Sequence, residues 1–164
     1  MTARPATPAD AAAIAAIYNE GIEDRVATFE TRPRTPSDVV KWFDGRHPVI
    51  VVEDEGRIVA FASTSTYRSR ECYDGIAETS LYVARATRGR GYGTAALEVI
   101  TRAAEQAGFW KLVSRVFPEN AASRALLGRA GFREVGIYHR HARLDGAWRD
   151  VIIVEKLIGD AANA

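Results

Sequence analysis

The chain has 164 residues, 47% of them hydrophobic and 26% charged, which is typical of one globular domain with a single core. Its 22 basic and 21 acidic side chains give a formal net charge of +1, which argues against nucleic acid or an anionic membrane as a partner. The single Cys72 excludes an internal disulfide, no stretch is apolar enough to span a membrane, and residues 1–14 lack a secretory leader pattern, so we expect a soluble, cytoplasmic protein.

The first third of the chain predicts two helices joined by a loop. Thr7 or Asp10 can cap the first helix, whose apolar residues recur at helical spacing until about Gly21. Residues 35–43 predict a second, short helix. The polar stretch 23–35 between them is typical of a loop, with Phe29 embedded in it.

The remaining chain alternates strands and helices. Residues 48–64 predict a hairpin with its turn at 54–56, and residues 77–83 predict a further strand. A helix from Thr94 follows, with Ala96, Ile100, Ala103 and Ala107 on its buried face, and Gly108 ends it. The pattern then predicts a strand over 111–117, a helix from Asn120 to Arg129, and a hairpin over 133–157 with its turn at Asp145–Gly146.

This order of elements predicts an α/β fold with a mixed central sheet, in which the central strands are parallel and the flanking strands antiparallel. We expect one domain over residues 1–164, with a flexible tail at 159–164. Since His139 and His141 share a strand face but have no third ligand at metal spacing, we expect no metal site.

The most specific local motif is the glycine-rich segment 88–94, which follows an apolar strand and opens a helix. Free backbone N–H groups at a helix N-terminus favour a phosphate, and Arg88 and Arg90 can add positive charge. The segment lacks the lysine of a Walker loop and the spacing of a dinucleotide fingerprint. The alternative is a tight turn with solvated arginines.

Three motifs in this order resemble the GNAT superfamily of acyl-CoA-dependent N-acetyltransferases: Arg88-x-x-Gly91-x-Gly93, then Asn120-x-x-Ser123-x-x-Leu126, then Gly131-Phe132. The segments 28–33, 67–83 and 145–151 are similar to phosphinothricin, arsinothricin and methionine sulfoximine N-acetyltransferases. The resemblance implies a GNAT-like sheet whose two parallel central strands splay apart, acetyl-CoA as co-substrate, a small amino-acid-like acceptor and a homodimer.

Mapped onto this chain, the resemblance implies a set of coenzyme-binding residues. The strand backbone before the turn would hold the pantetheine arm, and the turn would hold the diphosphate. The expected coenzyme-binding residues are Leu81, Tyr82, Val83, Arg88, Gly89, Arg90, Gly91, Tyr92, Gly93, Thr94, Asn120 and Ser123.

Acetyl transfer to an amine requires a base, because most amines are protonated at neutral pH. Strand alternation places Glu78, Ser80 and Tyr82 on one face, and Glu78 also matches the base of the resembled family. The alternative is a structural glutamate paired with Arg68 or Arg70. Backbone N–H groups at 81–83 could stabilise the oxyanion.

The expected acceptor site consists of Phe29, Arg68, Arg70, Tyr73 and Glu78. The two arginines, two apart, could bind the carboxylate or oxyanion of a small amino acid, with the aromatic side chains as walls. The alternative is an exposed, charged loop.

The leaving thiolate has no dedicated acid in the helix after Asn120. Many superfamily members carry a tyrosine there, whereas this helix offers only Ser123, and it has Leu127 where phosphinothricin enzymes often carry histidine. Two other functions remain open: acetylation of a peptide N-terminus, and a CoA-binding module without catalysis.

Overall fold

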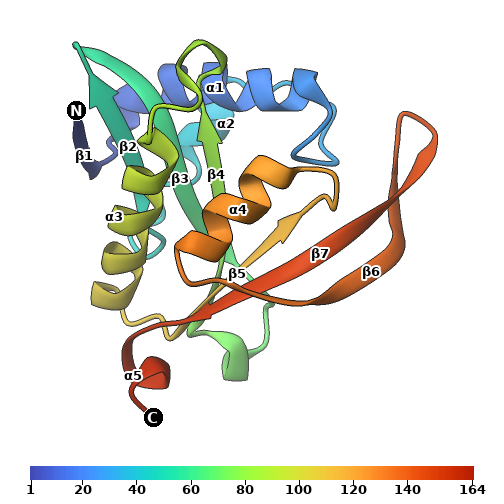
Figure 1. Ribbon diagram of the computed structural model, residues 1–164. Coiled ribbons are helices and arrows are strands. Elements are labelled where there is room, and N and C mark those ends of the chain that lie inside the picture. Colours follow the sequence, from blue (N-terminus) through green and yellow to red (C-terminus); the bar gives the residue numbers. More distant parts are fainter.

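The computed structural model describes residues 1–164 and contains one seven-stranded mixed sheet with helices on both faces (Figure 1). The strand order is β1-β2-β3-β4-β5-β7-β6, and only β4 and β5 run parallel to each other. The expected mixed α/β sheet with a parallel central pair is therefore confirmed. The strands are β1 (Thr2–Pro5), β2 (Val49–Asp54), β3 (Arg57–Thr66), β4 (Ile76–Val83), β5 (Lys111–Val116), β6 (Arg133–Leu144) and β7 (Ala147–Leu157).

Four helices cover the sheet, two on each face (Figure 1). On one face lie α1 (Ala11–Asp24) and α2 (Pro36–Val40), and on the other α3 (Tyr92–Gln106) and α4 (Ala121–Arg129). The chain ends in the short α5 (Gly159–Ala162), and short 3₁₀ turns lie at Pro8–Asp10, Glu71–Tyr73 and Arg85–Thr87.

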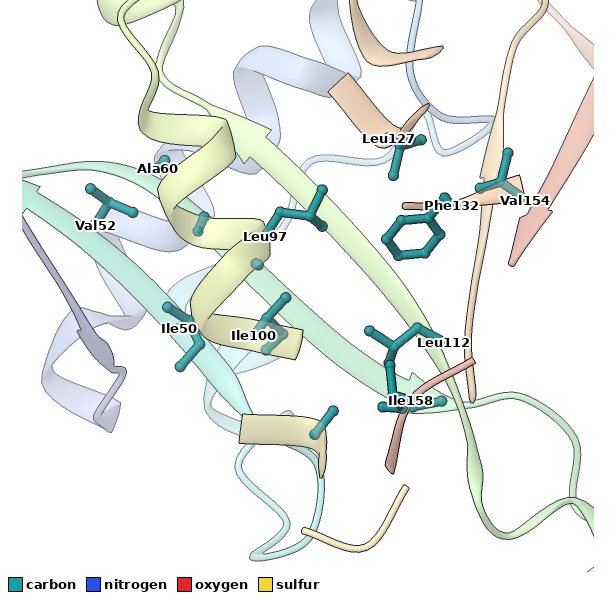
Figure 2. Packing of buried hydrophobic residues seen from close by; sticks show 14 of the residues in the cluster. Ile50, Val52, Ala60, Leu97, Ile100, Leu112, Leu127, Phe132, Val154 and Ile158 are labelled. Carbon is teal, nitrogen blue, oxygen red and sulfur yellow. The ribbon is translucent and has the colours of Figure 1, made fainter. Parts of the chain in front are cut away.

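The larger core lies between the sheet and α3 and contains 19 buried residues (Figure 2). Leu97 and Ile100 of α3 pack against strand residues such as Ile50 and Leu112, and all four side chains are at most 1% exposed. Burial of this apolar surface, at roughly 25 cal/mol per Å², fixes α3 on the sheet and so fixes the glycine-rich turn at its start. A second cluster of 8 buried residues packs α1 and α2 against the opposite face.

Both predicted hairpins have two-residue turns in the left-handed region. Glu55 and Gly56 have φ of 48° and 75°, and Asp145 and Gly146 have φ of 50° and 80°. This backbone twist matches the twist of the flanking strands, which explains why an acidic residue followed by glycine predicts both turns.

The structure differs from the prediction in several elements. The second helix is shorter than expected, ending at Val40 rather than at residue 43. The four-residue β1 carries no apolar alternation and was missed. The first helix continues past Gly21 to Asp24, because this glycine lies inside the helix where it packs against Tyr82. The third helix begins at Tyr92 rather than Thr94, and its buried face includes Leu97 and Ala104 but not the expected Ala107, which follows the end of the helix and is exposed.

Candidate active site

The central feature of the site is a seam where β4 and β5 part. Their parallel pairing covers only Ile76–Glu78 against Lys111–Val113, and the register of paired residues does not continue beyond Glu78. On its other side β4 stays paired with β3 up to Val83, and the Ala84 amide donates to the Val59 carbonyl at 2.8 Å. Because backbone groups alternate in direction along a strand, the N–H groups of Leu81 and Val83 point into the seam.

A side chain bridges the seam where the backbone ladder ends. The Ser114 hydroxyl donates to the Thr79 carbonyl at 2.8 Å, and both residues are buried. The Thr79 hydroxyl is itself buried and has no hydrogen-bond partner. On the N-terminal side of this bridge β4 and β5 are paired, and on its C-terminal side they border a cavity.

Two cavities open along the seam and share five lining residues. The first, which we call the seam cavity, has a volume of about 330 Å³ and lies around Glu78, Thr79 and Ser114. The second, the turn cavity, has a volume of about 460 Å³ and lies in front of residues 88–94. The residues common to both are Ala27, Leu81, Tyr82, Asn120 and Ser123.

The turn cavity contains most of the expected coenzyme-binding residues. Gly89 and Gly91 have φ of 80° and 87°, which only glycine adopts readily, and Gly91 precedes the first turn of α3. The first intrahelical bond of α3 runs from the Ala95 amide to the Gly91 carbonyl at 3.2 Å, so the three preceding N–H groups have no partner in the helix. Arg88 lines the cavity, whereas Arg90 lies outside the lining.

An acidic side chain from α1 holds Arg88 in place. Asp24 Oδ2 lies 2.7 Å from Arg88 Nη2, and Asp24 Oδ1 lies 2.8 Å from Arg85 Nη2. Burial raises the pKa of the Asp24 carboxyl, but the contacts with Arg85 and Arg88 outweigh burial and leave this pKa below its usual value. Arg88 Nε also donates to the Val83 carbonyl at 3.3 Å.

Asn120 joins the two cavities. Its side-chain oxygen accepts from the Ser123 amide at 3.2 Å and so caps α4, while its Nδ2 donates to the Val26 carbonyl at 3.3 Å. The second bond ties the loop after α1 to the start of α4. One residue therefore fixes both the helix that borders the seam and the loop that covers it.

The alternation expected along β4 is confirmed. Leu81 and Val83 pack toward the α3 core, whereas Tyr82 packs toward α1, with its ring 5.0 Å from Tyr18 and 5.4 Å from Phe61. Burial raises the pKa of the Tyr82 hydroxyl. Tyr82 is thus fixed on the α1 face, and its backbone borders the seam.

Glu78 lines the seam cavity and pairs with a residue that the sequence analysis did not propose. Its Oε1 lies 3.3 Å from Arg115 Nε on β5, rather than near Arg68 or Arg70. The side chain of Glu78 is 28% exposed. The partner follows from the parallel register, in which Glu78 lies opposite Val113 and Arg115 projects from the same face two residues further on.

The expected acceptor residues do not all meet at one place. Phe29 lines the seam cavity, with its ring 5.0 Å from that of Phe117. Arg68, Arg70 and Tyr73 are exposed on the segment between β3 and β4 and line neither cavity. The Arg68 guanidinium lies over the Tyr67 ring, 5.1 Å from its centroid.

Several residues of the site carried no local signal in the sequence. Arg115, Ser114 and Asp24 matter through contacts with strands or turns far away in the chain. Alternation over 111–117 predicts that Arg115 and the buried Ser114 lie on different faces of the strand, but it does not predict that Arg115 lies beside Glu78.

No group of three or more His, Cys, Asp or Glu side chains comes together in a way that could hold a metal ion. His139 instead faces Asp150, with 3.3 Å between Nδ1 and Oδ2. None of the helices has both the length and the apolar character needed to cross a bilayer.

Comparison with known proteins finds matches over most of the chain. The family model described as the acetyltransferase (GNAT) family matches residues 14–132. The L-methionine sulfoximine/L-methionine sulfone acetyltransferase of Pseudomonas paraeruginosa is 31% identical over 157 residues, which cover 93% of this chain and 91% of that protein.

Two solved structures are similar over nearly the whole chain. The ribosomal-protein-alanine N-acetyltransferase from Brucella melitensis has a TM-score of 0.91 and 31% identity, covering 96% of this chain and 100% of that one. The phosphinothricin acetyltransferase from Sinorhizobium meliloti in complex with AcCoA has a TM-score of 0.91 and 27% identity, covering 99% of this chain and 91% of that one.

Proposed function

The chain belongs to the GNAT acetyltransferase family, and from this premise we propose that it acetylates the α-amino group of a small amino acid or an amino-acid-like toxin, with acetyl-CoA as donor. Phosphinothricin, arsinothricin and methionine sulfoximine are the acceptor types we favour, because enzymes named for two of them are similar to nearly the whole chain. The observation that carries this proposal is the seam, which runs from the glycine-rich turn to Glu78.

The residues of the turn cavity fit a coenzyme that carries a diphosphate. The N–H groups at the start of α3 are unpaired within the helix, the helix dipole favours an anion there, and Arg88 adds positive charge. A Cβ on Gly89 or Gly91 would meet nothing within 4 Å, so the space in front of the turn is open. When bound, acetyl-CoA would supply an acetyl group activated as a thioester.

We assign the oxyanion-stabilising role to the backbone of β4. The N–H groups of Leu81 and Val83 point into the seam without a strand partner, so they can donate to an oxygen that gains negative charge. The neighbouring residues of β4 stay paired with β3, which holds these donors in position before any ligand arrives.

We assign the role of general base to Glu78, directly or through a water molecule. Its carboxylate lines the seam cavity, and Glu78 is the last residue of β4 that pairs with β5. Its Oε1 lies 3.3 Å from Arg115 Nε, and a carboxylate at this position can take the proton that the acceptor amine loses. The acceptor amine would lie between Glu78 and the N–H groups of Leu81 and Val83.

No side chain of α4 is proposed as the acid that protonates the leaving thiolate. Residue 127, on the helix that borders the seam, is a buried leucine, and Ser123 is the hydroxyl of α4 that lines both cavities. A thiol has an ordinary pKa of about 8.5, so the thiolate is a good enough leaving group to depart unassisted.

A second candidate function is acetylation of a peptide N-terminus. The structural similarity to a protein named ribosomal-protein-alanine N-acetyltransferase favours it. A peptide acceptor presents a neutral amide where a free amino acid presents a carboxylate, so the two functions can be told apart by the acceptor alone.

The test is a measurement of CoA release by the purified protein from acetyl-CoA. The acceptor panel consists of L-phosphinothricin, arsinothricin, L-methionine sulfoximine, L-methionine sulfone, the free amino acids and short peptides that begin with alanine. We expect turnover with one or more of the small acceptors. Turnover with peptides alone would support the second function, and binding of acetyl-CoA without turnover would indicate a non-catalytic module.

We also propose that the protein works in the cytoplasm as a homodimer. The edge strand β6 is exposed over almost its whole length and carries Val135, Ile137 and Tyr138, which are 46%, 49% and 47% exposed. Trp148 on the adjoining β7 is 54% exposed. A strand whose outer edge is unpaired and which carries several exposed apolar side chains favours contact with a second copy of the chain.

A further inference from the structure

The seam cavity contains one arginine, and that arginine is paired with the proposed base. Arg115 comes from β5 and Glu78 from β4, so the pair spans the seam at its narrow end. The other acidic residue of the lining, Glu30, is already paired with Arg34 at 2.8 Å. One positive and one negative side chain therefore face the acceptor space side by side.

The contact between Arg115 and Glu78 leaves most of the guanidinium available. Arg124 binds Glu134 through two hydrogen bonds, from Nε at 2.9 Å and from Nη2 at 3.1 Å. Arg115 instead approaches Glu78 through Nε at 3.3 Å, and its side chain is 42% exposed. A guanidinium has five N–H donors, so Arg115 can bind a second carboxylate without leaving Glu78.

We propose that Arg115 and Glu78 together recognise the zwitterionic head group of a free α-amino acid. The ammonium and carboxylate of such a molecule are attached to the same carbon, so they present opposite charges side by side, as the protein pair does. With the amine toward Glu78 and the carboxylate toward Arg115, each charge meets its opposite. Arg115 is then a substrate-binding residue on β5, and the base and the carboxylate site are neighbours.

This arrangement selects for free amino acids over peptides. A peptide N-terminus carries a neutral amide on its α-carbon, so Arg115 would gain no charged partner from it. The segment with Arg68 and Arg70 lies outside both cavities, which leaves Arg115 as the cation nearest to Glu78. The inference rests on the proposed function, because it assigns the acceptor within the same site.

The test compares two acceptors that differ only in the carboxylate, L-methionine sulfone and its α-carboxamide. Steady-state KM and kcat are measured for wild type, Arg115→Gln and Arg70→Ala. The control is Arg102→Gln, which removes another exposed arginine that pairs with a glutamate, 3.2 Å away on the outer side of α3. Circular dichroism and thermal unfolding confirm that each variant is folded.

We expect Arg115→Gln to raise KM for the sulfone by about 10- to 100-fold, as loss of a hydrogen bond to a charged group does. KM for the carboxamide should change less than about 3-fold, and Arg102→Gln should change neither. An equal effect on both acceptors would show that Arg115 acts only on Glu78 and would overturn the inference, as would a selective loss in Arg70→Ala with none in Arg115→Gln.

A binding measurement separates this inference from the proposed function. Calorimetric titration of L-methionine sulfone into the protein saturated with CoA should give heat with wild type and weakened binding with Arg115→Gln. If wild type acetylates no acceptor at all, the proposed function fails. If wild type acetylates the sulfone and Arg115→Gln matches it in both KM and affinity, only the role of Arg115 fails.

Discussion

The hydroxyl of Ser114 donates a hydrogen bond of 2.8 Å to the carbonyl of Thr79, across the point where β4 and β5 part. A sheet that opens inside its core exposes backbone groups that the ladder no longer pairs. Ser114 satisfies one of these groups with a side chain and so marks where pairing ends and the cavity begins.

Replacing Ser114 with alanine should destabilise the fold. The substitution removes the hydroxyl donor and leaves the buried Thr79 carbonyl without this hydrogen bond, which lowers the free energy of unfolding by about 1–3 kcal/mol. Urea unfolding of Ser114→Ala measures this loss, with Ser65→Ala, at an exposed position of β3, as the control that should change stability by less than about 0.5 kcal/mol. Equal stability of the two variants would mean that the bridge is not needed.

Two helical glycines should respond in opposite ways to alanine. A Cβ at Gly21 would lie 2.6 Å from the Tyr82 ring, whereas a Cβ at Gly128 would meet nothing within 4 Å. Overpacking at Gly21 should cost about 1–3 kcal/mol, while Gly128→Ala should gain about 0.5–1 kcal/mol from helix propensity. The unfolding free energies of the two variants measure this difference. A gain of stability in Gly21→Ala would contradict the close packing of Tyr82.

Replacing Glu78 with glutamine should lower kcat without affecting coenzyme binding. Loss of a general base reduces the rate by about 100- to 10,000-fold, and the turn cavity that would hold the diphosphate does not include Glu78. Acetyl transfer and calorimetry with acetyl-CoA separate the two effects. The control is Glu98→Gln, an exposed glutamate that also pairs with an arginine, and it should leave kcat unchanged. Wild-type turnover in Glu78→Gln would remove the base assignment.

The Asp24 contacts should stabilise the protein at neutral pH but not in acid. The folded-state pKa of Asp24 lies below its unfolded value, so its contribution is complete above about pH 4 and is lost as the pH falls through the folded-state pKa. Asp24→Asn should therefore be less stable than wild type at about pH 7, with a smaller difference at about pH 3. Asp160→Asn, on α5, serves as the control in urea titrations at both values. A difference that does not change with pH would argue against the ion pairs.

The proposed homodimer is tested by sedimentation velocity. The wild-type protein should sediment with twice the 18.0 kDa mass of one chain. Ile137→Asp on β6 should shift the protein toward the monomer, because an unpaired charge buried in the interface opposes association. Val40→Asp introduces the same charge at another exposed apolar position and should leave the dimer intact. A monomeric wild type would exclude the dimer, and a dimeric Ile137→Asp would place its interface elsewhere.

The parts of the site that the sequence predicts are those built from neighbours in the chain. The turn at 88–94 and the cap at Asn120 depend on backbone conformations that glycine and asparagine favour locally. The prediction of Glu78 as the base rests in the same way on its place at the start of an apolar strand. The family resemblance added the splayed pair of strands, which no local pattern indicates.

The parts that the sequence did not predict depend on register between distant strands. Arg115 meets Glu78 only because β4 and β5 pair in parallel with Glu78 opposite Val113. Asp24 meets Arg88 only because α1 ends beside the turn. The positions of Arg68 and Arg70 follow from a segment without regular periodicity, so alternation along the chain gave no information about their direction.

The parallel pairing at the centre of the sheet covers only three residue pairs, from Ile76 with Lys111 to Glu78 with Val113. A molecule that occupies the seam would therefore contact both halves of the sheet. Because it binds only the folded protein, it would raise the free energy of unfolding. The melting temperature of this protein should therefore rise with the concentration of acetyl-CoA, so heating the protein with and without the coenzyme shows how much of its stability depends on a filled seam.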